Sequence, residues 1–440
     1  MATESSIMDS NSFKEEYASM LSPKTREMIS KREKYLGGAY RLFYRKPLNI
    51  VRGEGDYLWD GEGNKYLDMY NNVAGVGHCN PAVVEAVTRY LHEKILDYSE
   101  ELLELMPDEI NKIMYMCTGS EANDLALRVA EAYTGGTGII ITQEAYHGTS
   151  ALTSGCSPSL GAGQPLLPNV RLITAPDYYR HGGTPEEFTA WYASEMQKTI
   201  DELNEAGYKF SCFLADSIFS SDGIYPDPVG FLKATVDVVH KNGGVFIADE
   251  VQPGFARTGQ AFFGFARHGI VPDMITMGKP MGNGIPISGL AAKEDVLAAF
   301  SDKLPYFNTF GGNPVSIAAA QAVLKYIKDE NLQEHCKKAG AALLKALKEV
   351  QERHPESVGD VRGAGLFLGF EFVKNDGNKT PDKDMALNVI EMLRDEHILT
   401  SVIGHYGNIL KLRPPMVFSE NDIDWFATSL DKCITKLENK

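Results

Sequence analysis

Short apolar runs alternate with stretches of helical pattern between about residues 60 and 320 of this 440-residue chain. Runs that are apolar throughout are typical of strands buried on both faces, which occur in parallel sheets covered by helices. Helical stretches such as 121–133, 187–205 and 232–241 separate several of them. The seven runs are Met114–Cys117, Gly138–Thr142, Val170–Ile173, Cys212–Ala215, Val245–Ala248, Met274–Met277 and Ile287–Ala292. The pattern predicts an α/β domain built on a mostly parallel sheet.

The same pattern divides the chain into three parts. Residues 61–320 form the large domain that carries the sheet, and residues 321–440 form a smaller α+β domain. Residues 1–60 contain a helix at 22–35 but no evident core of their own, so we expect them to join the small domain and to pack on the body or on a partner subunit. In the C-terminal part the pattern predicts helices at 314–328, 332–353, 384–395 and 420–437, and strands at 365–372 and 409–412.

The charge balance and the cysteines exclude several classes of protein. The chain has 59 acidic and 43 basic residues, a net charge of −16, which argues against a nucleic-acid binder. No apolar run approaches the roughly 20 residues that a membrane helix needs, and the polar, acidic start lacks the pattern of a secretory signal. The six cysteines are scattered without a close pair, so neither a metal site nor disulfides are expected. We therefore expect a cytoplasmic protein without a metal, a membrane segment or a nucleic-acid partner.

Charged side chains directly follow two of the predicted strands. Asp249 and Glu250 end the run that begins at Val245, and Lys279 stands among glycines just after Met277. Ligands of open α/β sheets bind beyond the carboxyl ends of the strands. A desolvated lysine there can form a Schiff base with a carbonyl compound, and a carboxylate can hold a cation. The alternatives are a strand-end cap or a salt bridge for the carboxylates and a solvated loop position for the lysine.

Two further segments fall at the same edge of the predicted sheet. Gly119 and Ser120 stand between a strand and a helix, where free backbone N–H groups and a hydroxyl can bind an anion, although a simple Ser N-cap has the same pattern. Tyr146 follows the run 138–142 and can either stack on a flat ring or belong to the core. An anion cradle, an aromatic ring, a carboxylate and a lysine together fit a phosphorylated, cationic heterocycle with an aldehyde. Pyridoxal 5′-phosphate is such a cofactor.

With these motifs the chain resembles the class III, or omega-type, aminotransferases of pyridoxal-phosphate fold type I. The likeness runs from about Tyr40 to Asn439 and rests on three motifs in order, Phe246–Gly259, Met277–Lys279 and Thr309–Pro314. The resemblance implies an α/β fold in which a domain with a mostly parallel seven-stranded sheet is joined to a smaller α+β domain. It also implies pyridoxal 5′-phosphate as the cofactor and a transaminase activity.

The resemblance assigns roles around the cofactor ring. It implies that Lys279 holds the cofactor as a Schiff base and moves protons, and that Asp249 pairs with the ring nitrogen and keeps it protonated. Gln252 matches the position that hydrogen-bonds the ring hydroxyl. Val251 and Tyr146 match the residues that pack on the two faces of the ring.

The resemblance also places the cofactor phosphate. Gly119 and Ser120 are implied to hold it, and Thr309 matches a threonine that reaches the phosphate of the neighbouring subunit. Each site would then need two chains. The resemblance therefore implies an obligatory homodimer with shared active sites, and it leaves open whether dimers pair into tetramers.

On the substrate side, Arg413 lies in a segment, 410–415, that matches the family's segment for carboxylate recognition. Arginine grips a carboxylate through two parallel N–H bonds, and the alternative is a surface ion pair. Tyr40, Phe43 and Tyr44 fall where family members line the substrate cleft. The implied reaction moves an amino group from an amine or omega-amino donor to a keto acid such as pyruvate, so the expected partners are small molecules.

A second reading uses the same cofactor for an elimination. Residues 71–79 also resemble the phospho-lyases of amino-alcohol phosphates in this class, which release ammonia and phosphate without a keto acid. The sequence shows no obvious extra basic cluster for a substrate phosphate, which favours the transaminase. A racemase is a further option, and a non-catalytic homologue is opposed by the presence of Lys279 and Asp249. The chain departs from the family pattern at Asp216, where many relatives carry a glutamate, and between Pro81 and Tyr98, where it is shorter.

Overall fold

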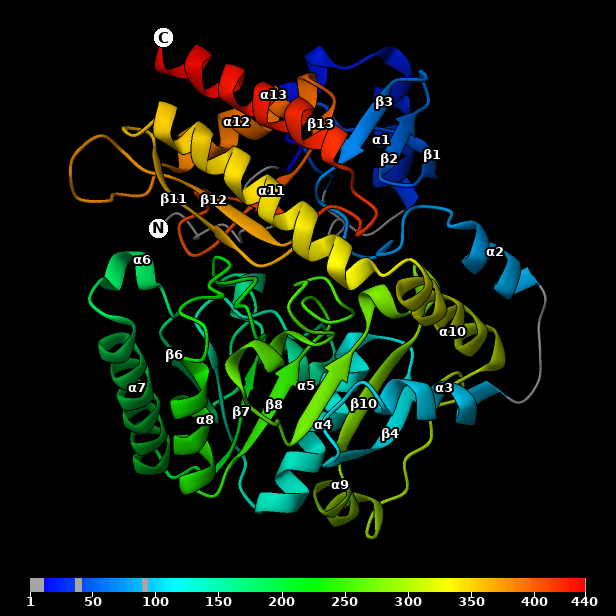
Figure 1. Ribbon diagram of the computed structural model, residues 1–440, viewed down its shortest axis with the longest axis vertical. Coiled ribbons are helices and arrows are strands. Elements are labelled where there is room, and N and C mark those ends of the chain that lie inside the picture. Colours follow the sequence, from blue (N-terminus) through cyan, green and yellow to red (C-terminus); the bar gives the residue numbers. More distant parts are fainter. Residues whose placement is uncertain (1–11, 36–41, 89–93, 440) are drawn as a thin grey trace.

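The computed structural model of the protein describes residues 12–35, 42–88 and 94–439. A large domain occupies the lower half of Figure 1, from the cyan to the yellow-green elements. A smaller domain above it combines blue N-terminal elements with orange and red C-terminal ones (Figure 1). The two ends of the chain therefore contribute to the same part of the molecule.

The large domain is built on a seven-stranded sheet with the strand order β4, β10, β9, β8, β7, β5, β6. β10 runs antiparallel to both of its neighbours, whereas the pairs from β9 through β6 are parallel. In the same spatial order the strands span Ile110–Met116, Ser288–Lys293, Met274–Met277, Val245–Asp249, Phe210–Ala215, Gly138–Thr142 and Val170–Ile173. The predicted mostly parallel sheet is confirmed, and each predicted run overlaps one of these strands.

Helices cover both faces of this sheet, and the strand side chains alternate between the faces. Phe213 and Phe246 pack in one core cluster with α7 and α8, whereas their neighbours Leu214 and Ile247 pack in a second cluster with α4 and α9. These helices are α7 (Pro185–Glu205), α8 (Leu232–Lys241), α4 (Gly119–Thr134) and α9 (Glu294–Ser301). Because side chains leave a strand on alternate faces, burial of both faces makes the strands apolar at every position.

Three helices pack together near the β4 edge of the sheet, where α3 contacts β4 and α10 packs against both of the others. They are α2 (Pro81–Thr88), α3 (Lys94–Leu103) and α10 (Pro314–Asp329). The stretch between Pro81 and Tyr98, which is shorter than in the family pattern, is divided between α2 and α3. Its middle part, residues 89–93, lies outside the described residues.

The C-terminal part of the small domain is an antiparallel sheet with the strand order β11, β12, β15, β14, packed against three helices. The strands are β11 (Val358–Gly363), β12 (Leu368–Phe372), β15 (Ile409–Leu412) and β14 (Ser401–Ile403). The helices are α11 (Leu332–Arg353), α12 (Lys383–Asp395) and α13 (Glu420–Glu438). Leu410 and Leu412 of β15 belong to the core cluster that includes these helices, so Lys411 between them faces the opposite side of the sheet.

The N-terminal segment contributes α1 (Pro23–Tyr35) and three strands that belong to another small sheet. β1 (Ile50–Glu54), β2 (Tyr57–Asp60) and β3 (Lys65–Asp68) form a meander, and β13 (Ile398–Leu399) pairs with β3 in parallel. The beginning of the chain is thus joined by backbone hydrogen bonds to the C-terminal part.

Buried polar contacts hold the two domains together. Arg257, in the loop after β8, donates from Nη1 to the carbonyl oxygens of Leu366 (3.2 Å) and Pro414 (2.6 Å). Leu366 in turn donates its backbone N–H to the carbonyl of Arg257 (3.1 Å). Farther along the interface, Arg180 forms an ion pair with Glu371 of β12 (2.5 Å). These contacts set the position of β15 relative to the end of β8.

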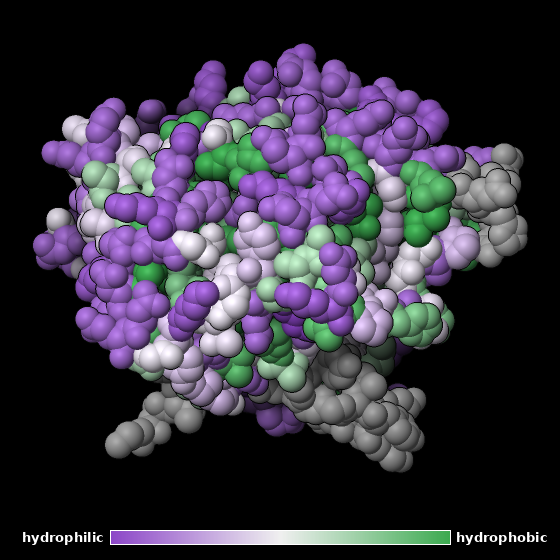
Figure 2. All heavy atoms as spheres, turned by 90° about the horizontal axis from the view of Figure 1, so that it is seen from below, coloured by the Kyte–Doolittle hydropathy of each residue, from purple (hydrophilic) through white to green (hydrophobic). Residues whose placement is uncertain are grey.

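The face of the large domain that looks away from the small domain is largely hydrophilic, with small hydrophobic patches between the polar groups (Figure 2). In the part of the chain that the structure describes, no helix combines the length and the apolar character that a membrane crossing requires.

Candidate active site

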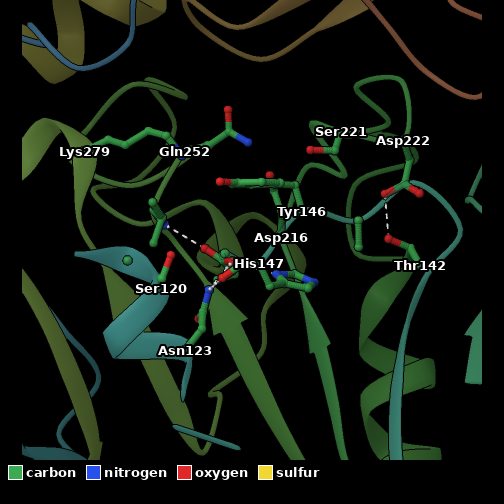
Figure 3. A pocket seen from close by; sticks show the side chains of 15 residues that line it. Ser120, Asn123, Thr142, Tyr146, His147, Asp216, Ser221, Asp222, Gln252 and Lys279 are labelled. Carbon is green, nitrogen blue, oxygen red and sulfur yellow. Dashed lines mark hydrogen bonds and ion pairs between the residues drawn. The ribbon is translucent and has the colours of Figure 1, made fainter. Parts of the chain in front are cut away.

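A cavity of about 180 Å³ lies beyond the carboxyl ends of β5, β7 and β8. Its wall contains every residue that the resemblance assigned to the cofactor, with the single exception of Thr309. Figure 3 shows these side chains from close by, with Lys279 and Gln252 above the Tyr146 ring and Ser120 and Asn123 below it. The parallel strands bring together residues that are up to 160 positions apart in the chain (Gly119 to Lys279).

Asp249 is the anionic centre of this cavity. It is the last residue of β8 and is 5% exposed. His147 donates from Nδ1 to its Oδ2 (2.7 Å), Asn123 donates from Nδ2 to the same oxygen (2.9 Å), and the backbone N–H of Val251 donates to Oδ1 (3.1 Å). Asn123 is itself oriented by Thr276, whose hydroxyl donates to its amide oxygen (2.6 Å).

These donors keep the carboxylate ionised. Burial on its own raises the pKa of Asp249, but the hydrogen bonds from His147 and Asn123 and the positive charges of His147 and Lys279 outweigh it, so the pKa lies below its ordinary value. The Nε2 of His147 is buried without a partner in the described structure. The arrangement therefore provides a fixed negative charge that can pair with a cationic ring nitrogen.

Glu250 has a different task, although it is the neighbour of Asp249. It points to the other side of the strand end, where Ser217 Oγ (2.7 Å) and the backbone N–H groups of Gly264 (2.7 Å) and Phe265 (2.9 Å) donate to its oxygens. Burial raises the pKa of Glu250 to about 7. The strand-end cap that the sequence offered as an alternative for both carboxylates thus describes Glu250 and not Asp249.

Lys279 enters the cavity from the adjacent strand β9. It begins the short 3-10 helix Lys279–Gly282, and its Nζ lies 6.0 Å from the centre of the Tyr146 ring. Burial and the positive charge of Arg413 lower the pKa of Lys279 to about 8, while Asp249 and Asp216 act in the opposite direction. An amine with this pKa is partly unprotonated near neutral pH, as a nucleophile for a carbonyl carbon must be.

The anion cradle lies at the N-terminus of α4. Thr118 caps this helix in a reciprocal capping box with Glu121, and Gly119 and Ser120 form its first turn. Thr149 donates its backbone N–H to Ser120 Oγ (3.1 Å). A Cβ on Gly119 would lie 3.1 Å from Cγ2 of Val251, so glycine permits the close approach of the helix to this residue. Free N–H groups and the positive end of a 16-residue helix favour a phosphate here.

Gln252 connects the cavity to the small domain. It donates from Nε2 to Ser220 Oγ (2.8 Å) and accepts a hydrogen bond from Nη1 of Arg413. The guanidinium carbon of Arg413 lies 4.6 Å from the centre of the Tyr70 ring. Arg413 is 6% exposed and does not line the cavity itself, so it is a buried residue and not the surface ion pair of the alternative.

The aromatic residues predicted for the substrate cleft belong to the N-terminal segment. Tyr44 is 8% exposed and donates its hydroxyl to the carbonyl of Thr400 (2.8 Å), and Phe43 contacts the Tyr70 ring edge-on with ring centres 5.8 Å apart. Neither lines the cavity, and Tyr40 lies outside the described residues. Thr309 is exposed on the loop between α9 and α10 and does not line the cavity of its own chain.

Several residues of the site carry no role in the sequence prediction. His147 and Asn123 stand inside the motifs around Tyr146 and Ser120, but nothing in their spacing shows that both reach Asp249. Asp222 also lines the cavity, accepting from the hydroxyl of Thr142 (2.6 Å). The signal available in the sequence was that these polar residues follow soon after buried strands.

The residues of this cavity fit pyridoxal 5′-phosphate. The cofactor needs a lysine for its aldehyde, a carboxylate for its ring nitrogen, a flat aromatic contact and an anion cradle, and Lys279, Asp249, Tyr146 and the α4 N-terminus supply these around one space. Among the described residues, no group of three or more His, Cys, Asp or Glu side chains is arranged to hold a metal ion.

Fold and site together define a pyridoxal-phosphate enzyme of fold type I. The model of the family described as aminotransferase class III matches residues 43–434. The chain belongs to this family, and it is a pyridoxal-phosphate-dependent aminotransferase by fold, motif order and cavity.

Individual relatives carry two kinds of name. The chain is 37% identical to the alanine–glyoxylate aminotransferase 2-like protein of Drosophila melanogaster, over 93% of this chain and 87% of that protein. It is 35% identical to the ethanolamine-phosphate phospho-lyase homolog 1 of Caenorhabditis elegans, over 93% of each chain. A solved phospholyase from Arthrobacter, in complex with phosphoethanolamine, superposes with a TM-score of 0.88 at 36% identity and covers 93% of this chain and 99% of that chain.

Proposed function

We propose that the protein transfers an amino group from an amine or omega-amino donor to a keto acid such as pyruvate. The observation that carries the proposal is the meeting of Lys279 with the Asp249 cluster in one cavity. The names of the aminotransferase relatives support it. In the balanced reaction the donor amine becomes a ketone or aldehyde, and the keto acid becomes an amino acid.

Pyridoxal phosphate, when bound, supplies a ring that stabilises negative charge on the carbon next to the amino nitrogen. Asp249, held ionised by His147 and Asn123, keeps a positive charge on the ring nitrogen favourable. The α4 N-terminus would hold the phosphate, and Val251 and Tyr146 line the space where the ring would lie.

Lys279 moves the proton. Its Nζ would remove the proton from the carbon that bears the donor's amino group, and in the second half-reaction it would deliver a proton to the keto carbon of the acceptor. A group with a pKa of about 8 can both accept and donate a proton near neutral pH. Because the side chain enters from β9 next to β8, Lys279 and Asp249 act from adjacent strand ends. Arg413 donates a hydrogen bond to Gln252 in the structure. It is the group that we propose to turn toward the carboxylate of the keto acid.

The test is the visible absorbance of the cofactor-loaded protein. An amine donor added without an acceptor should bleach the yellow band, and pyruvate should restore it. A band that no amine bleaches, while ammonia or phosphate accumulates, contradicts the transaminase.

Elimination is the second candidate, and the phospho-lyase names of two of the relatives favour it. An amino-alcohol phosphate plus water would give an aldehyde, ammonia and phosphate. This reaction proceeds without a keto acid, so ammonia and phosphate formed in its absence identify it.

We also propose a homodimer with shared sites. Thr309 stands between Phe307 and Phe310, which are 87% and 67% exposed, and large apolar side chains exposed side by side mark an interaction surface. Phe307→Asp should yield monomers in analytical ultracentrifugation and should weaken cofactor binding, whereas Tyr406→Asp, at another half-exposed aromatic residue, should do neither. A dimeric Phe307→Asp protein contradicts the proposal. A cytoplasmic location stays a proposal from the sequence, which cell fractionation tests.

A further inference from the structure

The loop that follows β7 forms one wall of the cavity and has a strained backbone. Asp216, Ser221 and Asp222 of this loop line the cavity. Phe219 and Ile224 have φ angles of +51° and +62°, in the left-handed region that residues other than glycine rarely adopt. The conformation is especially unfavourable for Ile224, which is branched at Cβ. Strain of this kind persists only where the surrounding structure enforces it.

The cavity side of this loop is bound to the end of β5. The Thr142 hydroxyl (2.6 Å) and the backbone N–H of Glu144 (2.8 Å) donate to the two carboxylate oxygens of Asp222 (Figure 3). The N–H groups of Gly223 and Ile224 donate to a carbonyl earlier in the loop (3.2 and 3.0 Å). These contacts use the N–H groups of the two residues but not their carbonyls, and both residues are buried.

Arg362, on β11 of the small domain, binds these two carbonyls. Its Nε donates to the carbonyl of Ile224 (2.7 Å), and its Nη2 donates to that of Gly223 (2.7 Å). Its Nη1 donates to the carboxylates of Asp360 (2.7 Å) and Glu371 (2.8 Å). One guanidinium therefore joins two carboxylates of the small domain to the backbone of the cavity loop.

The guanidinium of Arg362 is buried and charged. The side chain is 9% exposed, and its guanidinium carbon lies 4.5 Å from the centre of the Tyr225 ring. Burial on its own lowers the pKa of Arg362, but the negative charges of Glu371 and Asp360 outweigh it, so the pKa lies above its ordinary value. A planar fork of donors can reach four acceptors at once, which the single ammonium of a lysine cannot do.

We propose that Arg362 is a positioning residue of the active site, which holds the strained loop 219–224 so that Ser221 and Asp222 stay in the cavity wall. It acts through the loop backbone and does not line the cavity itself. The wall is then complete only when β11 of the small domain is packed on the large domain. The inference concerns the binding of the cofactor, so it applies to transamination and to elimination alike.

Arg180 provides a matched control within the large domain. It pairs with the same Glu371 across the domain interface (2.5 Å). Its further hydrogen bonds, to Asp177 (2.9 Å) and to the carbonyl of Lys379 (3.2 Å), lie outside the loop. Arg180 thus shares an ion-pair partner with Arg362 but does not bind the loop.

The experiment combines hydrogen exchange, measured by mass spectrometry, with a cofactor titration. Exchange is followed in the cofactor-loaded protein in peptides that cover residues 218–226, because the amides 223–225 are hydrogen-bonded inside the loop. The variants are Arg362→Lys and Arg180→Lys, which keep the charge and remove the fork. Arg362→Gln replaces the first variant if that one does not fold. The affinity of each apoprotein for pyridoxal phosphate is measured by visible absorbance.

In Arg362→Lys the loop should exchange at least about tenfold faster and the cofactor should bind about tenfold more weakly, whereas Arg180→Lys should stay within about twofold of wild type in both. The proposal is overturned if Arg362→Lys exchanges and binds like the wild type, because charge alone would then be sufficient. It is also overturned if Arg180→Lys loses as much, because the cause would then be a loosened domain interface. Faster exchange with unchanged cofactor affinity contradicts it as well.

The wild type alone provides a second test, which does not depend on the folding of a variant. Coupling between two sites is reciprocal, so a wall that is held in place for the cofactor should in turn be stabilised by it. The amides 223–225 should therefore exchange at least about threefold more slowly in the loaded protein than in the apoprotein. Equal exchange in the two forms overturns the proposal. None of these measurements uses an amine or a keto acid, so failure of the transaminase proposal is a separate result.

Discussion

His147→Leu tests the idea that a hydrogen-bonded network prepares Asp249 for the cofactor. The substitution removes the Nδ1 donor at 2.7 Å and leaves the donors Asn123 at 2.9 Å and the Val251 backbone at 3.1 Å. A hydrogen bond to a charged group contributes about 1.5–3 kcal/mol. We therefore expect the cofactor to dissociate about ten to a hundred times more readily, because burial then raises the pKa of Asp249.

The chain contains a matched control in His240→Leu. His240 donates from Nε2 to Asp273 Oδ2 (2.8 Å), an equivalent pair that lies outside the cavity. Asp273 keeps Lys293 and the Phe246 backbone as partners, just as Asp249 keeps two of its own. The control should leave cofactor affinity unchanged, and it should cost less thermal stability, because the His240 side chain is 39% exposed whereas that of His147 is 2% exposed.

The assay is a titration of each apoprotein with pyridoxal phosphate, followed by visible absorbance, with melting temperature measured in parallel. Cofactor affinity within twofold of wild type in His147→Leu would refute the reasoning. So would an equal loss of affinity in His240→Leu, because the effect would then come from general destabilisation.

Lys279, Gly148 and Asp56 give three further predictions. Burial and Arg413 lower the pKa of Lys279 to about 8. Cofactor uptake by the apoprotein, followed by stopped-flow absorbance, should therefore become faster as pH rises through 8. Lys279→Ala should lose this pH dependence and should slow turnover by at least about a thousandfold. Gly148→Ala should weaken cofactor binding about tenfold or more in an absorbance titration, because Gly148 has φ +141° and a Cβ would lie 2.5 Å from Ser120 Oγ. Burial and the Asp422 charge raise the pKa of Asp56 to about 7. The native state thus holds a proton that the unfolded state releases at lower pH, so the wild type loses stability as pH rises from about 4 through 7. Asp56→Asn should therefore have a free energy of unfolding roughly 1–2 kcal/mol higher than wild type at pH 8, though not at pH 4.

The parallel sheet was predictable because its signal is local. A strand buried on both faces is apolar at each position, so Gly138–Thr142 and Met274–Met277 coincide with β5 and β9. The strands β11 and β14 were not predicted. β11 has a mixed burial pattern and contains Gly359, Asp360 and Arg362, so its residues do not form an apolar run.

The site was predictable where a strand end and a motif coincide. Alternation along a strand predicts that Asp249 and Glu250 point in opposite directions, but it does not say which of them enters the cavity. That choice depends on the loop at Gly264 and Phe265, which offers its N–H groups to Glu250. The burial of Lys411 likewise follows from the packing of two domains and has no local signal.

The division of the site between the domains bears on which reaction the chain performs. Lys279 and Asp249 belong to the large domain and serve a cofactor that both transamination and elimination require. Identities of 37% and 35% to relatives with the two kinds of name do not separate these reactions. What differs between them is the anion to be held, a carboxylate on the acceptor or a phosphate that leaves. Arg413, which follows β15 in the small domain, is the cation proposed for the carboxylate, and Arg257 holds the chain beside it by donating to the carbonyl of Pro414 (2.6 Å).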